Sequence, residues 1–186
     1  MQDEGHLFVA PPAGWTLTTI LGEMLHVAEA RFGPRDRSWT IIGIEIGETT
    51  QAPCVWFPGN RKHVAVRLAA NAATCWRQAC FQLAHEAVHL LDPNGGGKAP
   101  VIEEGVATTF ADEMAFANGW NMKTVHPSYT RAKQLLGQLL ALEPEAVSIL
   151  RARAPFPKLT AEIVQERIAG CPRDLAEDLA GSFKPG

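Results

Sequence analysis

The chain has 186 residues, of which 46% are hydrophobic and 20% charged, a composition typical of a globular protein with one core. Its 17 basic and 20 acidic residues give a net charge of −3, and no basic run suits a phosphate backbone. These values argue against a nucleic acid partner. No apolar stretch is long enough to span a bilayer, which argues against a membrane partner.

The opening residues and the cysteines indicate a cytoplasmic protein. Residues 1–6 lack the basic residues and apolar core of a secretory signal. The cysteines are too few and too scattered for a disulfide scaffold, so we expect buried free thiols in a reducing compartment. The cysteines are Cys54, Cys75, Cys80 and Cys171.

Hydrophobic spacing and turn residues predict a single α+β domain over residues 1–186. The first half is expected to contain an irregular lead-in over 1–16, a helix over 18–32, and strands over 39–46, 54–57 and 62–68, the last two forming a hairpin. The longest helix is predicted over 71–91, with Asn71 as its N-cap. A shorter helix follows Pro100 and runs toward residue 118, and residues 128–186 predict three or four more helices.

The longest predicted helix contains the sequence His85-Glu86-Ala87-Val88-His89, an HExxH pattern. Histidines four residues apart lie on one helix face, so both rings can reach the same ion. A helical projection places the apolar residues of this segment on one broad arc, with the two histidines and Glu86 outside it. That second side is either the wall of a metal site or a solvated polar face.

A third metal ligand is expected because a catalytic zinc ion takes three protein ligands. Glu103 and Glu104 are adjacent acids at the start of the next predicted helix. Neighbouring helical side chains diverge by about 100°, so only one of the two can face the ion. The other is expected to be a solvated acid that the helix N-terminus stabilises.

At these residues the sequence resembles the gluzincin metallopeptidases, in which a glutamate on the helix after HExxH is the third zinc ligand. Glu104, in Glu104-Gly105-Val106-Ala107, matches the register of that glutamate. Over roughly residues 62–117, the chain is also similar to the ImmA/IrrE-like metallopeptidases. The resemblance implies a small mixed or antiparallel sheet packed on a zincin-type helix pair, while the hydrophobic spacing predicts the mostly helical C-terminal part over 128–186. It further implies one zinc ion per chain on His85, His89 and Glu104.

The expected function is hydrolysis of peptide bonds in a peptide or protein substrate. Zinc lowers the pKa of its bound water, and Glu86 is the expected general base that takes the proton and later protonates the leaving amine. By its position, strand 62–68 resembles the edge strand on which such enzymes bind an extended peptide. The alternative is a catalytically silent zinc-binding sensor or interaction protein. Glu86 favours the enzyme, since zinc binding alone does not require it.

Two supporting roles have several candidates. The carbonyl oxygen of a substrate gains negative charge in the transition state, and its hydrogen-bond donor could be Tyr129, His126 or Arg131. Tyr129 could equally be a packing residue. Asp92 or Asp112 could orient the imidazole ligands, although Asp92 could also be a helix cap.

Overall fold

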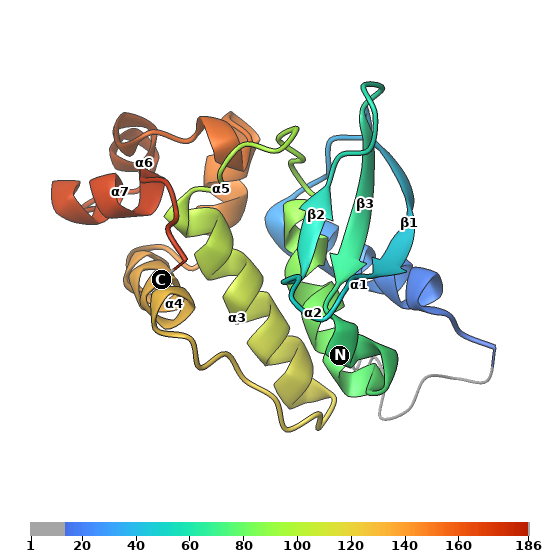
Figure 1. Cartoon of the computed structure of the whole chain (residues 1–186). Coiled ribbons are helices and arrows are strands. Elements are labelled where there is room, and N and C mark those ends of the chain that lie inside the picture. Colours follow the sequence, from blue (N-terminus) through green and yellow to red (C-terminus); the bar gives the residue numbers. More distant parts are fainter. Residues whose placement is uncertain (1–13, 186) are drawn as a thin grey trace.

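The structure, a computed structural model, describes residues 14–185 and has an α+β architecture (Figure 1). The opening residues and all but the end of the predicted lead-in lie outside the described residues. The helices and strands are α1 (Leu17–Phe32), β1 (Thr40–Ile46), β2 (Cys54–Trp56), β3 (His63–Leu68), α2 (Trp76–His89), α3 (Val101–Ala117), α4 (Pro127–Leu142), α5 (Ala146–Arg153), α6 (Ala161–Arg167) and α7 (Arg173–Ala180). The predicted α+β class and helical C-terminal part are confirmed.

The sheet is mixed and has three strands in the order β1-β3-β2. β1 runs parallel to β3, whereas β2 runs antiparallel to it and forms the predicted hairpin. β3 is buried along most of its length, while β1 and β2 are only partly covered. The expectation that strand 62–68 is an edge strand is wrong, because β1 and β2 occupy its two sides. The free edge nearest the HExxH helix belongs to β2.

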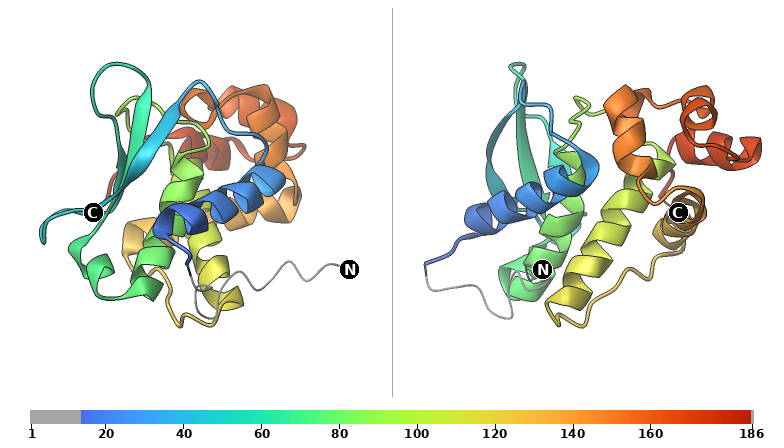
Figure 2. Two further views of the ribbon diagram at one scale, coloured as in Figure 1. Left: turned by 90° about the vertical axis from the view of Figure 1, so that its right-hand side faces the viewer. Right: turned by 180° about the vertical axis from the view of Figure 1, so that it is seen from behind.

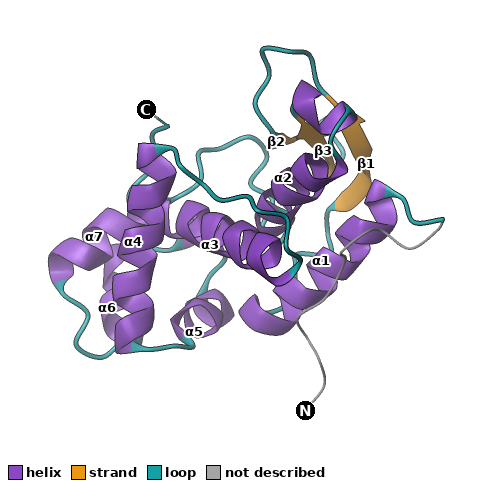
Figure 3. Cartoon of the chain, turned by 90° about the horizontal axis from the view of Figure 1, so that it is seen from below, coloured by secondary structure: helices purple, strands orange, loops and turns teal. Residues whose placement is uncertain are grey.

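The helices form the larger part of the molecule. Figure 1 and Figure 2 show the sheet at one side, α4 to α7 at the other, and α2 and α3 between them. α3 runs back alongside α2 and packs on α4 with its other side, as the view from below in Figure 3 also shows. None of the described helices has the length and apolar content needed to cross a bilayer.

The HExxH helix is shorter than predicted. α2 begins at Trp76, and the preceding residues form a short 3₁₀ segment, η1 (Ala70–Ala73), so Asn71 is not the N-cap. The Asn71 side chain instead accepts a hydrogen bond from Gln82 Nε2 at 2.8 Å, and Gln82 Oε1 accepts one from Ala69 N at 2.8 Å. These bonds pair polar groups of the segment between β3 and α2 that a continuous helix would otherwise pair. They explain why α2 begins later than predicted.

The cysteines are all free, and their burial differs from the prediction at two positions, Cys54 and Cys75. Cys80 and Cys171 are buried as expected, and Cys54 is half-buried on β2. Burial raises the pKa of the Cys80 thiol to about 12. Cys75 is exposed, because it is the residue that caps α2 rather than part of a longer helix.

A buried ion pair connects the C-terminal helices to the loop after α2. Arg151 Nε and Nη2 donate to the two carboxylate oxygens of Asp92 at 2.9 and 3.0 Å. The two side chains are only 4% and 7% exposed. The same guanidinium donates to the carbonyl oxygens of Phe32, Gly33 and Pro34 at the end of α1. Arg151, which is on α5, therefore connects that helix to the end of α1 and to the loop after α2. The partner of the Asp92 carboxylate is Arg151 rather than a histidine.

Candidate metal centre

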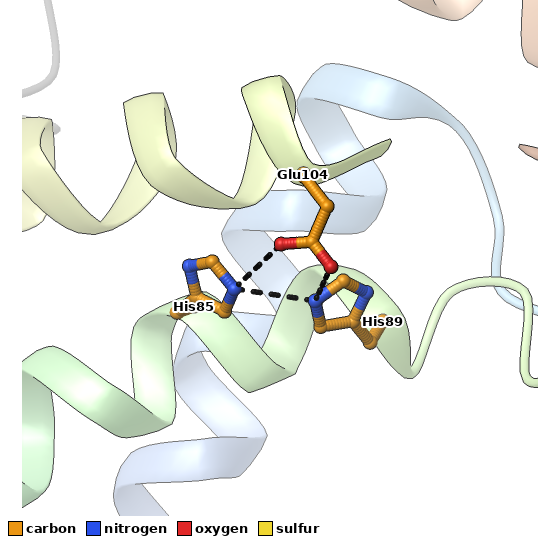
Figure 4. A group of neighbouring side chains, drawn as sticks. All are labelled: His85, His89 and Glu104. Atoms are coloured by element: carbon orange, nitrogen blue, oxygen red, sulfur yellow. Dashed lines mark hydrogen bonds and ion pairs between the residues drawn. The ribbon is translucent and has the colours of Figure 1, made fainter. Parts of the chain in front are cut away.

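α2 directs the side chains of His85 and His89 toward α3, while its opposite side packs into the core (Figure 4). Ala84 and Val88 on that opposite side are fully buried. The polar side of α2 is also covered: Glu86 is only 3% exposed, and His89 is buried. The alternative of a solvated polar face is therefore wrong.

Glu104 reaches the two histidines from the first turn of α3. His85 Nε2 lies 3.2 Å from His89 Nε2 and 3.3 Å from Glu104 Oε2, and His89 Nε2 lies 3.7 Å from Glu104 Oε1. Tetrahedral coordination with zinc bonds of about 2.0–2.1 Å separates neighbouring ligand atoms by about 3.3 Å. The distance between the two histidines, and the distance from each histidine to its nearer Glu104 oxygen, are close to this spacing.

Glu103, the neighbour of Glu104, faces a different atom of the same site. Its Oε1 lies 2.7 Å from His89 Nδ1, and its side chain is only 2% exposed. A carboxylate beside Nδ1 favours the tautomer in which Nδ1 carries the proton and Nε2 has a free electron pair. The expectation that the second acid is solvated is wrong, because the divergence of adjacent helical positions turns Glu103 toward the far side of the imidazole ring.

The orienting carboxylate is therefore neither of the two predicted from the sequence. Asp92 binds Arg151, as described above, and Asp112 binds Lys133 Nζ at 2.6 Å and the backbone N–H of Thr124 at 2.8 Å. From the sequence, Glu103 is expected to be either the rival ligand or a solvated acid at the helix N-terminus, not a partner of His89. Its position next to Glu104, facing HExxH from the following helix, was the signal that could have suggested an orienting role.

The carboxylates make the centre attractive to a cation. Burial raises the pKa of Glu86 and that of Glu103. Burial opposes ionisation of Glu104 as well, but its hydrogen bond to His85 and the nearby imidazoles lower the pKa of Glu104 overall. At His89, burial is outweighed by the hydrogen bond to Glu103 and by the neighbouring carboxylates, which raise the pKa of His89 to about 10 in the metal-free centre. A metal ion bound at Nε2 would displace the proton from that nitrogen and leave the proton on Nδ1. A buried set of carboxylates and imidazoles suits a metal ion.

Gly105 explains how α3 can carry Glu104 so close to α4. A Cβ atom at this position would lie 2.7 Å from the carbonyl oxygen of Ala132 and 3.1 Å from the Cβ of Leu136. The first distance is too short for any larger residue unless the backbone of α4 moves. The Glu104-Gly105 pair thus joins a candidate metal-ligating carboxylate to a close helix contact.

The histidines and Glu104 line a cleft of about 650 Å³. Cys54, Val55 and Phe57 border it on the side of β2, and residues 123–126 border it from the segment before α4. The backbone N–H of Val55 hydrogen-bonds to Glu86 and lowers the pKa of that carboxyl, although burial raises it more. Glu86 therefore lies beside the unpaired edge of β2, where an extended peptide could add as a further strand.

Two of the three candidate donors lie in this cleft. Tyr129 and His126 line it, and the Tyr129 ring lies 5.7 Å from the His85 ring, measured between centroids. Burial, with the negative charges of Glu104 and Glu86, raises the pKa of Tyr129 to about 12, so its hydroxyl keeps a proton to donate. Arg131 is exposed, pairs with Asp178 at 3.4 Å and does not line the cleft.

His85-xxx-His89 and Glu104 form an arrangement compatible with an HExxH-type metal site, and their ligand atoms all lie within 4.8 Å of one another. Among the described residues, this is the only such group of His, Cys, Asp and Glu side chains. The chain was also compared with family models, curated proteins and solved structures. None of them matches it.

Proposed function

We propose that this chain is a zinc-dependent metallopeptidase of the gluzincin type, with His85, His89 and Glu104 as ligands and Glu86 as general base. The observation that carries the proposal is the convergence of two imidazoles and one carboxylate, with one ligand atom from each within 4.8 Å of the others, beside a buried carboxylate at the edge of a sheet. Two imidazoles and one carboxylate are a ligand set typical of catalytic zinc, with a fourth position left for water or substrate.

The residues of the chain have separate tasks in the proposed reaction. Zinc supplies Lewis-acid polarisation of the scissile carbonyl and lowers the pKa of water toward neutrality. Glu86 accepts a proton from the attacking water and passes it to the leaving amine. Burial raises the pKa of Glu86, which makes its carboxylate a stronger base toward the attacking water. Glu103 holds the His89 ring through Nδ1.

The substrate proposed is a peptide or a segment of a protein in extended conformation. The free edge of β2 offers backbone hydrogen bonds, which give affinity with little dependence on side-chain sequence. Tyr129, on the other wall of the cleft, is proposed to donate a hydrogen bond to the carbonyl oxygen as negative charge develops there. His126, which contacts the Tyr129 ring, is the second candidate for that role.

The proposal is tested by metal content and chelator-sensitive cleavage. The purified chain is expected to bind one zinc ion, measured by elemental analysis, and to cleave members of a random peptide library only while zinc is present. His85→Ala and His89→Ala should each abolish both properties, because two remaining ligands hold zinc poorly. Absence of metal uptake would contradict the site. Zinc uptake with no cleavage of any peptide would favour the catalytically silent alternative.

The two adjacent acids should differ in their effect on zinc binding. Glu104→Ala removes a ligand and should abolish tight binding. Glu103→Ala removes only the partner of His89 Nδ1 and should weaken binding by about 10- to 100-fold, the usual effect of losing an orienting group. Competition with a chromophoric chelator measures both affinities. A larger loss in Glu103→Ala than in Glu104→Ala would transfer the ligand role to Glu103.

A further inference from the structure

The C-terminal tail (residues 181–185) lies beside the residues that lead into α3, the helix that carries Glu104. It runs antiparallel to the residues that lead into α3: Val101 N donates to Gly181 O at 2.8 Å, and Phe183 N donates to Ala99 O at 2.9 Å. These bonds fix the tail against the first turn of the helix that carries the carboxylate ligand. The side chain of Phe183 is consequently only 8% exposed.

The Phe183 ring packs on Tyr129, which in turn contacts a metal ligand. The centroids of the Phe183 and Tyr129 rings are 4.8 Å apart with the planes tilted by 52°, and the Tyr129 and His85 rings meet edge to face at 5.7 Å. Tyr129 lies in the first turn of α4, whose N-cap residue, His126, makes no side-chain capping bond. The tyrosine ring contacts the rings of His85, His126 and Phe183, and Phe183 is the closest of them by centroid distance.

We propose that Phe183 is a positioning residue that holds Tyr129 against the metal centre, which makes the C-terminal tail a part of the active site. The catalytic part of this proposal rests on the proposed function, in which Tyr129 donates to the substrate carbonyl. Loss of the Phe183 ring leaves a space beside Tyr129, and the phenol can then turn away from the position that the carbonyl oxygen occupies. Small displacements of a catalytic group cost large factors in rate.

The position of Tyr129 can be measured without any activity. Tyr129 is the only tyrosine of the chain, so incorporation of 3-fluorotyrosine gives one ¹⁹F resonance. In the wild type we expect a single narrow resonance that Co²⁺, added in place of zinc, displaces strongly. In Phe183→Leu the metal-free resonance should shift and broaden, and the Co²⁺-induced displacement should shrink. Phe156→Leu, which changes another buried phenylalanine of the C-terminal part, should retain the wild-type resonance.

A resonance in Phe183→Leu identical to that of the wild type in position and width would overturn the proposal. This readout does not depend on the proposed function. If Co²⁺ displaces no resonance because the chain binds no metal, the proposed function fails, and with it the catalytic part of this inference. The metal-free spectra of the two variants still decide whether Phe183 holds the tyrosine ring.

Kinetics on a peptide that the wild type cleaves give the second test. Phe183→Leu should lower kcat by about tenfold with little change in KM, because the transition state and not the bound peptide needs the hydroxyl. In a Tyr129→Phe background the same substitution should have no further effect on kcat, since its target is gone. An equal fold-loss in both backgrounds would show that Phe183 acts through general stability and would overturn the positioning role.

Discussion

Replacing Glu86 with glutamine should lower the rate of peptide hydrolysis by about 10² to 10⁴ and leave the zinc content unchanged. Glutamine keeps the size of the side chain and can still accept the hydrogen bond from Val55, but it has no basic oxygen that can take a proton. Since Glu86 is buried with a raised pKa, the neutral side chain should cost little folding stability. Rates on a chelator-sensitive peptide, elemental analysis and thermal unfolding measure the three effects.

Glu166→Gln is the matched control, because Glu166 is an exposed glutamate on α6, away from the cleft. It should cleave peptides at the wild-type rate. If Glu86→Gln also did so with its zinc intact, Glu86 would have no catalytic role, and the proposed mechanism would be wrong even with the metal site correct. A variant that loses zinc would instead point to a structural role for Glu86 in the centre.

Local sequence patterns predicted the elements of this fold well where one helix face or one turn decides the outcome. The helix predicted over 18–32 is α1, in which Thr16 and Thr19 form a capping box at the start and Gly33, with φ of 95°, ends the helix. The helix predicted after Pro100 is α3, and the four helices from Pro127 to Ala180 agree with the three or four expected. Each of these boundaries depends on residues a few positions apart.

The errors concern features that distant residues decide. The order β1-β3-β2 depends on a parallel pairing between β1 and β3, although β2 lies between them in the sequence. No local pattern encodes such a pairing. The start of α2 depends on hydrogen bonds from Gln82 to the segment that precedes the helix. In both cases the apolar pattern predicted the element itself. It contains no information on the contacts that determine the strand order or the first residue of the helix.

The candidate site shows the same difference between local features and contacts of the folded chain. The pairing of His85 with His89 is a property of one helix, and the matching register of Glu104 was predicted from a motif on the next. The contacts of Glu103 with His89 and of Phe183 with Tyr129 were not predicted, because they exist only in the folded chain. Candidate ligands can be predicted from spacing, whereas the residues that contact them are visible only once the helices are packed.

Replacing Arg151 with methionine should lower the free energy of unfolding by about 3 to 5 kcal/mol, the usual cost of breaking a buried ion pair. The substitution leaves the carboxylate of Asp92 without its charged partner and removes the donors to the carbonyl oxygens at the end of α1. Methionine keeps most of the side-chain volume, so packing loss contributes little. Urea unfolding followed by tryptophan fluorescence measures the change. Arg173→Met, which breaks the exposed Arg173–Glu177 pair, should leave the stability close to that of the wild type.

A second variant separates the ion pair from the other bonds of Arg151. In the Arg151→Met, Asp92→Leu double variant no buried charge is left unpaired, so part of the lost stability should return. The carbonyl oxygens of Phe32 and Gly33 still lack their donor, so recovery should be incomplete. A double variant less stable than Arg151→Met would mean that Asp92 stabilises the fold without Arg151, through the hydrogen bond that it accepts from Phe156 N at 2.9 Å.

Because Asp92 follows His89 by three residues, a loosened loop should also weaken zinc binding in Arg151→Met, and the same chelator competition measures that loss.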